Sequence, residues 1–234
     1  MNDSADDRSI EWPLKTTEQR LFAAAVAHDL KSPVNNIVGQ IGILEELQET
    51  TEEQRRRYEI IRQSALKIMN LLNSLRDLTS ATGRPLRKKE VDITTLANRI
   101  LQEHPVKDRT ILSHVESGLH AYADENLIED ALENLIGNAL KFTASKPVTK
   151  IDVGDVVIEG ERYFFVRDNG VGFDQKYSHR LFRPFSRLHS QKEFDGSGIG
   201  LVTVRAIVER HGGKVRIESK VGAGTVLYFS LPSA

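Results

Sequence analysis

The first third of the chain contains two stretches in which apolar residues recur at steps of three and four. The positions in the first stretch are Ala27, Leu30, Val34, Ile37, Ile41 and Leu44. Those in the second stretch are Ile61, Ala65, Ile68, Leu72 and Leu75. This heptad spacing is typical of helices that pack in a bundle, so we expect a long helical hairpin with helices at about residues 17–49 and 51–80.

Local signals mark the ends of both predicted helices. Thr16 and Gln19 form a capping box before the first helix, and residues 50–54 (Thr-Thr-Glu-Glu-Gln) offer another before the second. Pro33 lacks the N–H that would bond the carbonyl four residues earlier, so we expect it to bend the first helix. The second helix ends at Gly83 and Pro85. We therefore assign residues 1–15 to an N-terminal tail or connector and residues 16–82 to the hairpin.

The length of the hairpin predicts how its apolar stripes are covered. Helices of about 30 residues are each about 45 Å long, and a lone hairpin leaves part of both stripes in water. Two hairpins paired in a four-helix bundle remove this exposure. Burial of a large aliphatic side chain contributes about 1.5–3 kcal/mol, so about ten of them outweigh the entropy of association. We predict a homodimer; the alternative is that the hairpin packs on the chain's own second domain.

From residue 86 onward the pattern changes to short strands and helices. Strands are expected at residues 86–93, 110–116, 119–123, 149–159, 162–167, 214–219 and 225–231. Helices are expected at residues 94–103, 125–143 and 198–211, with a charged and aromatic loop at 173–197. Because neighbouring strands join through short turns, the pattern favours a layered α/β sandwich of mixed strand order over a doubly wound sheet. Residues 83–234 thus form the second domain, and the whole chain is of the α+β class.

Composition excludes several classes of function. The net charge of −1 over 234 residues gives no electrostatic case for binding nucleic acid or an anionic membrane. The absence of cysteine excludes disulfides, thiolate metal sites and a cysteine nucleophile. No apolar run approaches the ~20 residues of a membrane span, and no signal peptide is recognisable. We therefore expect a cytoplasmic protein without a membrane span.

A histidine followed by a carboxylate, His28-Asp29, lies on the first predicted helix. At 100° per residue, His28 lies roughly 130° from the apolar seam, so its imidazole is expected to point into solvent. Taken alone, this arrangement is more typical of an ordinary solvated histidine than of a reactive one. A neutral imidazole is available near pH 7, and an adjacent carboxylate can accept the proton of its second ring nitrogen.

The predicted helix at 125–143 carries a polar stripe formed by Asn134, Asn138 and Lys141, at spacings of four and three. Asparagine prefers caps to helix interiors, because its side chain competes for backbone hydrogen bonds. Amide oxygens suit Mg²⁺, and an ammonium group suits a polyphosphate. The stripe therefore suggests a metal and phosphate site, with a solvated polar face as the alternative.

Two glycine motifs follow. Asp168-Asn169-Gly170-Val171-Gly172 comes directly after an apolar strand, where a carboxylate could accept from the exocyclic amine of a flat ligand; the alternative is a tight turn. Residues 196–201 (Gly-Ser-Gly-Ile-Gly-Leu) open a helix, whose free N–H groups would favour phosphate. No strand precedes this motif, which excludes a dinucleotide-binding fold. A serine/threonine kinase is excluded because its His-Arg-Asp and Asp-Phe-Gly motifs are missing.

Taken in order, these motifs resemble the sensor histidine kinases of two-component systems, over roughly residues 17–232. The resemblance is carried by residues 28–33, 134–143, 168–172, 181–185, 196–201 and 222–225. The segments at 185–201 and 210–213 look most like phytochrome-type kinases. The resemblance implies a dimeric four-helix phosphoacceptor domain, followed by an ATP-binding sandwich of the kind shared with DNA gyrase and the Hsp90 chaperones.

The resemblance also implies roles for individual residues. Asn134 and Asn138 would hold Mg²⁺, Lys141 would reach phosphate, and Asp168 would meet the adenine amine. The other residues matched to nucleotide contacts are Gly170, Gly172, Arg183, Arg187, Gly196, Gly198, Gly200, Leu201 and Thr225. Residues 173–197 would form a lid over ATP.

The reaction implied by the family is attack of His28 on the γ-phosphorus of Mg-ATP, with Asp29 orienting and activating the imidazole. The phosphoryl group would then pass to an aspartate on the receiver domain of a response regulator. Ser32 stands where the family often has Thr or Asn, a position tied to phosphatase activity. Residues 1–15 are too few for a sensory domain, so we expect the signal to come from an upstream sensor domain or a sensory partner.

Two alternative functions use the same domains. An ATP hydrolase or ATP-gated clamp would need a glutamate base where this chain has Asn134, and an amide cannot take a proton from water. A docking or phosphorelay module without kinase activity would not need intact asparagine and glycine motifs. Both motifs therefore favour the histidine kinase.

Overall fold

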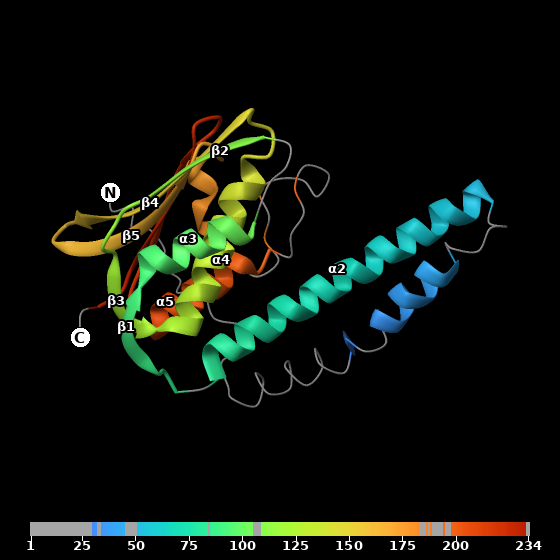
Figure 1. Ribbon diagram of the computed structural model, residues 1–234, viewed down its shortest axis with the longest axis horizontal. Coiled ribbons are helices and arrows are strands. Elements are labelled where there is room, and N and C mark those ends of the chain that lie inside the picture. Colours follow the sequence, from blue (N-terminus) through green and yellow to red (C-terminus); the bar gives the residue numbers. More distant parts are fainter. Residues whose placement is uncertain are drawn as a thin grey trace, which may run out of the picture. The chain divides into compact units, whose positions relative to one another are not determined.

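The computed structural model describes residues 30–31, 34–44, 51–83, 85–104, 109–182, 186, 188, 194 and 198–232. The chain divides into two compact units, Met1–Thr79 and Ser80–Ala234 (Figure 1). The described residues of the first unit are almost all helical, and the second unit contains all the described strands. Within the described part of the chain, no helix is both long and apolar enough to cross a membrane.

The helical unit contains a helix over residues 34–44 and the longer helix α2 (Glu52–Gly83). The capping box predicted before α2 is confirmed at Thr51 and Gln54. The Gln54 N–H donates to the Thr51 hydroxyl at 3.2 Å, and the Thr51 N–H donates to the Gln54 side-chain oxygen at 2.8 Å. The predicted first cap at Thr16 and the bend at Pro33 lie outside the described residues.

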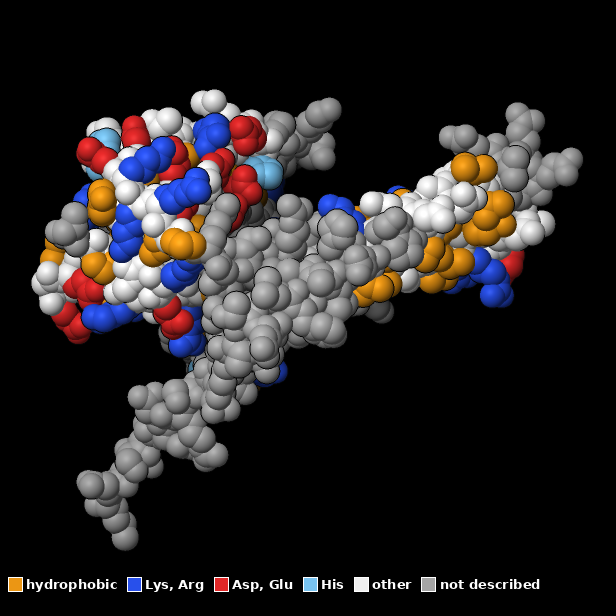
Figure 2. Space-filling view, turned by 90° about the horizontal axis from the view of Figure 1, so that it is seen from below, with side chains coloured by type: hydrophobic (Ala, Val, Ile, Leu, Met, Phe, Trp, Pro, Cys, Tyr) orange, Lys and Arg blue, Asp and Glu red, His pale blue; other side chains and the backbone are white. Residues whose placement is uncertain are grey.

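Within each helix of the helical unit, buried and exposed residues alternate along the heptad stripe. Its buried members are Val34, Ile41, Ala65 and Leu72. Its exposed members are Leu30, Ile37, Ile61 and Ile68, each with 44–46% of its surface exposed. Figure 2 shows hydrophobic side chains along the exposed surface of this unit. Since the exposed members recur every seven residues within each helix, they form an apolar strip along each helix that this chain leaves exposed.

The second unit is built on a five-stranded sheet with the order β2-β4-β5-β7-β6. Its strands are β2 (Thr110–Val115), β4 (Val148–Ile158), β5 (Glu161–Asp168), β6 (Val215–Lys220) and β7 (Gly224–Ser230). The β2–β4 pair is parallel and the other pairs are antiparallel, which gives the mixed order expected from the sequence. A separate antiparallel pair joins β1 (Lys88–Asp92) to β3 (His120–Asp124).

Helices α3 (Ile93–Glu103), α4 (Glu125–Phe142) and α5 (Gly200–Arg210) lie together on one face of this sheet (Figure 1). The Asp92 carboxylate caps α3 by accepting from the Thr95 N–H, and Asp124 caps α4 by accepting from the Leu127 N–H. The apolar face of α4 is buried against the sheet, as its periodicity predicts. Its polar stripe is therefore left facing the end of the sheet near α5.

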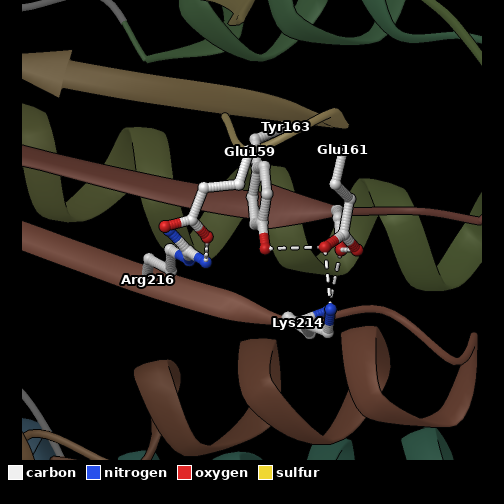
Figure 3. A network of polar contacts seen from close by, with 6 residues as sticks. Glu159, Glu161, Tyr163, Lys214 and Arg216 are labelled. Atoms are coloured by element: carbon white, nitrogen blue, oxygen red, sulfur yellow. Dashed lines mark hydrogen bonds and ion pairs between the residues drawn. The ribbon is translucent and has the colours of Figure 1, made fainter. Parts of the chain in front are cut away.

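The opposite face of the sheet carries a smaller aromatic cluster of Tyr163, Phe165 and Tyr228. Charged side chains border this cluster (Figure 3). Glu159 pairs with Arg216 at 2.7 Å, and Glu161 pairs with Lys214 at 2.8 Å and accepts from the Tyr163 hydroxyl at 3.1 Å. These pairs link the β4–β5 turn and the start of β5 to the start of the edge strand β6 and the residue before it.

The predicted 173–197 loop begins with a short 3-10 helix, η1 (Gln175–Arg180), that the sequence did not indicate. The Gln175 side chain holds η1 against the edge strand β6. Its amide nitrogen donates to Ile217 O at 2.9 Å, and its amide oxygen accepts from the Ser219 N–H at 2.8 Å. One side chain thus satisfies two backbone groups of an edge strand.

Candidate nucleotide site

The second unit contains a cavity of about 260 Å³ between α4, the end of β5, the β6–β7 pair and the start of α5. Its polar and glycine lining residues are Asn134, Asn138, Lys141, Asp168, Gly172, Ser186, Gly198, Gly200 and Thr225. Its apolar lining residues include Leu135, Ala139, Phe142, Val166, Phe173, Leu188, Phe194, Leu201, Ile217 and Leu227. The cavity therefore combines a broad apolar surface with a few converging polar groups, as small-molecule sites do.

One wall of the cavity is the polar stripe of α4. Asn134, Asn138 and Lys141 all line it, because residues three and four apart share a face of a helix. The Asn134 amide nitrogen donates to Asp130 O at 2.8 Å, which fixes the side chain. Its amide oxygen then lies against Gly200 at the start of α5, so closely that a Cβ on Gly200 would overlap it.

Aromatic contacts extend this wall beyond Lys141. The Lys141 ammonium lies 4.4 Å from the centre of the Phe142 ring, within the range of a cation–π contact. The Phe194 ring meets the Phe142 ring edge-on, with 5.1 Å between centroids. The Phe142 carbonyl accepts from the Val171 N–H at 3.1 Å. The end of α4 is thereby joined to the glycine segment after β5.

Asp168 stands at the end of β5 and presents a carboxylate to the cavity. It accepts a hydrogen bond from the Gly170 N–H at 2.7 Å and another from the backbone of Thr225. Burial raises the pKa of Asp168 to about 6, against the lowering effect of these two hydrogen bonds. The carboxylate is therefore ionised at neutral pH but close to its titration range.

Glycines let the two segments around Asp168 pack at backbone distance. Gly172 (φ 59°) lies against the carbonyl of Lys220, and Gly224 (φ 100°) lies against the carbonyl of Asp168, so a Cβ at either position would overlap backbone. Gly170 does not line the cavity, but a Cβ there would come within 2.6 Å of the Phe142 carbonyl. The glycines predicted from the sequence thus form a close-packed support for Asp168.

The N-terminus of α5 forms the opposite wall. Gly198 (φ 73°), Gly200 and Leu201 line the cavity there, and the N-cap residue Ile199 supplies no side-chain cap. The first N–H groups of a helix lack intrahelical partners and carry the positive end of its dipole. This end of the cavity therefore favours an anionic group.

The remaining predicted site residues lie outside the described part of the chain. They are His28, Asp29, Ser32, Arg183, Arg187 and Gly196. The cavity also has apolar walls that the sequence motifs do not mark: Val166, Phe173, Ile217, Leu227 and Phe194. The alternation of apolar and polar residues along β6 marks Ile217 as inward-facing, but it does not separate a core position from a cavity wall. β5 and β7 each contain four consecutive apolar or aromatic residues, so their sequences do not mark the faces of Val166 and Leu227.

The side chains that line the cavity limit how it could bind a metal ion. Among the described residues, no group of three or more His, Cys, Asp or Glu side chains could hold a metal ion. Two amide side chains, Asn134 and Asn138, are too few ligands for Mg²⁺, which takes six oxygens and usually keeps several waters or phosphates. The residues therefore fit a metal that arrives together with a phosphate ligand, not one held by protein alone.

Two protein-family profiles match the chain. The profile of the "His Kinase A (phospho-acceptor) domain" covers residues 18–84, and that of the "Histidine kinase-, DNA gyrase B-, and HSP90-like ATPase" covers residues 123–234. The chain belongs to the sensor histidine kinases. Of the two profiles, the second covers α4, the glycine segments and α5, which are the elements that form the cavity.

Individual relatives within this family support the assignment. The chain is 32% identical over 97% of its length to the methanogenesis regulatory histidine kinase FilI of Methanothrix harundinacea, and 30% identical over 92% to cyanobacterial phytochrome A of Nostoc. It spans 26% and 28% of the length of these proteins. Because the relatives include phytochromes as well as FilI, the phytochrome-type subfamily stays a prediction.

Solved structures of histidine kinases share the fold. Full-length ShkA, crystallised with AMPPNP, superposes with a TM-score of 0.66 at 26% identity, covering 94% of this chain and 47% of ShkA. The mycobacterial sensor histidine kinase MprB gives a TM-score of 0.52 at 26% identity, covering 62% of this chain and 97% of that one. The α+β fold predicted from the sequence, with a helical part followed by the sandwich, is therefore confirmed.

Proposed function

We propose that this protein catalyses the ATP-dependent autophosphorylation of His28 and passes the phosphoryl group to an aspartate of a response regulator. The observation that carries the proposal is the convergence of Asn134, Asn138, Lys141 and Asp168 with the N-terminus of α5 on one cavity. Membership of the sensor histidine kinases supports it, as does the likeness to ShkA, which was crystallised with the ATP analogue AMPPNP.

We assign the base of ATP to the Asp168 end of the cavity. An ionised carboxylate held by two backbone N–H groups retains lone pairs that can accept from the exocyclic amine of adenine. The nearby apolar side chains of Val166, Phe173 and Leu227 would exclude water from the faces of the ring. A purine without that amine would lose this hydrogen bond and leave one acceptor position of the buried carboxylate without a donor.

We assign the phosphates to the opposite end, between Lys141 and the N-terminus of α5. The ammonium and the first backbone N–H groups of α5 are positive groups at this end of the cavity. Asn134 and Asn138 would hold Mg²⁺, which when bound would supply charge neutralisation on the phosphate oxygens. Lys141 would exchange its contact with the Phe142 ring for a stronger one with phosphate.

The phosphoacceptor in this proposal is the His28 imidazole. A neutral ring nitrogen attacks the γ-phosphorus, the bond to the bridging oxygen breaks, and ADP leaves. Asp29 accepts the proton of the second ring nitrogen, which fixes the tautomer and offsets the charge that develops on the ring. The phosphoryl group of the phosphoramidate then transfers to the receiver aspartate, which frees the His28 nitrogen. Ser32 is the position at which a water would be held if the protein also hydrolyses the regulator's phosphoaspartate to phosphate.

The exposed heptad positions support the homodimer. Leu30, Ile37, Ile61 and Ile68 recur at the period expected of an interhelical seam, yet one chain leaves each of them nearly half exposed. A second hairpin would cover this strip in a four-helix bundle. We propose that the phosphoacceptor domains pair in this way, with the signal arriving from an upstream sensor domain or sensory partner.

The geometry of Asn134 argues against an ATP hydrolase. Its amide nitrogen donates to a backbone carbonyl, and an amide has no basic atom that could take a proton from water. A hydrolase needs a general base within hydrogen-bond reach of the attacking water. The cavity is therefore better suited to hold ATP for transfer to another nucleophile than to hydrolyse it.

The proposal is tested by incubation of the protein with Mg²⁺ and ATP labelled at the γ-phosphate. We expect label on the protein that is stable in base and lost in acid, as a phosphoramidate is. The variant His28→Gln should bind ATP with unchanged affinity and take up no label. If His28→Gln still accepts label of the same chemical stability, the phosphoacceptor is another residue.

A further inference from the structure

The hydroxyl of Ser219 joins three segments that surround Asp168. Ser219 lies on β6, directly opposite Thr225 on β7. Its oxygen accepts from the Phe173 N–H at 2.9 Å and donates to Gly224 O at 2.9 Å. It also lies 3.0 Å from the Thr225 hydroxyl. Since Ser219 directs its only proton to Gly224, the Thr225 hydroxyl is the donor in the last contact, and every position around the Ser219 oxygen is used.

The partners of Ser219 are parts of the cavity, although Ser219 itself does not line it. Phe173 and Thr225 both line the cavity. The Thr225 backbone donates to the Asp168 carboxylate, and Gly224 packs against the Asp168 carbonyl. The hydroxyl therefore holds a donor to Asp168 on one side and an apolar wall of the base pocket on the other.

The backbone of Ser219 is also fixed. Its N–H donates to the side-chain oxygen of Gln175 at 2.8 Å, and the Gln175 amide nitrogen donates to Ile217 O at 2.9 Å. The strand carrying Ser219 is thus held on its outer edge as well as by β7. Movement of Ser219 would require several hydrogen bonds to break together, so its hydroxyl is a stable reference point for the residues around it.

We propose that Ser219 is a positioning residue for base recognition: its hydroxyl holds the Thr225 N–H on Asp168 and sets the Phe173 wall of the base pocket. The inference rests on the proposed ATP binding at Asp168. It assigns Ser219 no contact with the nucleotide. Its effect passes through the two hydrogen bonds that it accepts, from Phe173 and Thr225, and the one that it donates, to Gly224.

Removal of the hydroxyl has two expected effects on binding. In Ser219→Ala the Phe173 N–H loses its acceptor and Thr225 is free to move, so we expect the Kd for ATP to rise by about tenfold at neutral pH. Loss of the Thr225 hydrogen bond would also remove one of the two contacts that stabilise the ionised carboxylate. The pH at which ATP binding is lost on acidification should therefore move upward from the wild-type value.

The pH profile of each variant is compared with that of wild type, because other charged groups lie near Asp168. Lys141 lines the cavity from α4, Lys146 donates to Gly222 O, and Lys220 lies at the end of β6. These groups are common to every variant, so they do not alter the comparison in the acidic range in which Asp168 changes charge. The γ-phosphate titrates in that range too, but its contribution is common to every variant and cancels in the comparison.

A matched control is available at the other end of β7. The Ser230 hydroxyl, like that of Ser219, accepts from a backbone N–H, that of Lys214, at 2.9 Å. It donates to the Glu161 carboxylate at 2.9 Å and has no link to the cavity. Ser230→Ala should cost stability as Ser219→Ala does, but should leave ATP affinity and its pH profile unchanged. Ser219→Thr keeps the hydroxyl and should restore the ATP affinity and the pH profile of the wild type.

The experiment measures ATP affinity by titration calorimetry from about pH 5.5 to 8.5. The full chain is used as wild type and as Ser219→Ala, Ser219→Thr, Ser230→Ala and Asp168→Asn. The inference is supported if Ser219→Ala binds ATP more weakly and loses it at a higher pH than wild type, while Ser219→Thr and Ser230→Ala behave as wild type does. Unchanged affinity and pH profile in Ser219→Ala, with binding still dependent on Asp168, overturns it. If wild type does not bind ATP, or Asp168→Asn binds it equally well, the proposed function itself fails.

Discussion

The backbone N–H of Gly170 donates a 2.7 Å hydrogen bond to Oδ1 of Asp168, the last residue of β5. The bond orients the carboxylate and stabilises its charged form. Burial acts in the opposite sense and prevails, so the pKa of Asp168 is raised to about 6. The carboxylate is thus kept in a state that costs stability but suits it to accept a hydrogen bond from a ligand.

Asp168→Asn should stabilise the free protein and abolish ATP binding. A carboxyl with a raised pKa holds its proton better in the folded than in the unfolded chain, so its contribution to stability falls as pH rises from 3.8 to about 6. Above that window, removing the charge should recover up to about 2–3 kcal/mol. Urea unfolding at pH 7.5 measures the gain, and calorimetry measures the loss of binding. Greater stability together with intact binding would contradict the base-recognition role.

Two glycines near Asn134 should respond oppositely to alanine. Gly137 is inside α4 with open space around it, so Gly137→Ala should stabilise the protein by about 0.5–1 kcal/mol through helix propensity. A Cβ on Gly200 would overlap the Asn134 amide oxygen, so Gly200→Ala should displace that side chain and weaken ATP binding by about tenfold or more. Thermal unfolding and ATP affinity, measured on both variants, test the pair. Equal affinity in the two variants would remove Asn134 from the phosphate end of the site.

The features of this protein that the sequence predicted are those set by local periodicity and local capping. The shared face of Asn134, Asn138 and Lys141 follows from helix geometry alone, and the N-cap role of Asp124 follows from its place before an apolar repeat. The hydrogen bonds of the Ser219 hydroxyl could not be predicted in this way. Its hydroxyl meets Phe173, 46 residues earlier, and this contact depends on how the edge strand β6 packs against the segment after β5.

The turn between β4 and β5 contains a residue whose backbone strain a substitution can relieve. Glu159 has a φ of 55° and Gly160 a φ of 81°, the left-handed pair of a type I′ turn, in which asparagine is favoured at the first position. Glu159→Asn should stabilise the protein by about 0.5–1 kcal/mol. Its lost ion pair with Arg216, visible in Figure 3, is solvent-exposed and contributes little.

Glu159→Ala is the control for this turn, because it removes the same ion pair and keeps an unfavourable side chain at positive φ. It should be no more stable than wild type. Urea midpoints of the three proteins, measured under one condition, separate backbone strain from charge. If the asparagine and alanine variants shift equally, the ion pair and not the backbone governs the stability of the turn.

The exposed apolar strip of the hairpin predicts that one charge will separate the dimer. Ile61→Asp would bury a carboxylate in the proposed seam, so the dimer dissociation constant should rise by at least about 100-fold. Gln63→Asp adds the same charge to α2 on the side away from the strip and should leave the dimer intact. Light scattering over a concentration series measures both. A dimeric Ile61→Asp protein would show that the strip is covered in another way.

His211 should make the stability of the second unit sensitive to acid. The imidazole is 3% exposed; one ring nitrogen lies 2.7 Å from Ile207 O and the other accepts from the Asp124 N–H at 3.0 Å. Burial lowers the pKa of His211, although the Ile207 carbonyl acts against this. Of the charged groups around it, Lys88 and Arg210 also lower the pKa, and Asp124 raises it. The ring is therefore held neutral at a point that joins the end of α5 to the N-cap of α4.

A histidine with a lowered pKa binds its proton less well in the folded than in the unfolded chain. Its contribution to stability is therefore lost as pH falls below about 6.5, the unfolded value, toward the folded one. Asp168 acts in the opposite sense at acidic pH, so the variants must be compared with wild type and not read alone. His211→Gln should flatten the decline in unfolding free energy between about pH 6.5 and 5, whereas His114→Gln, at an exposed position, should not. An unchanged slope in His211→Gln would show that another group in this unit takes up the proton.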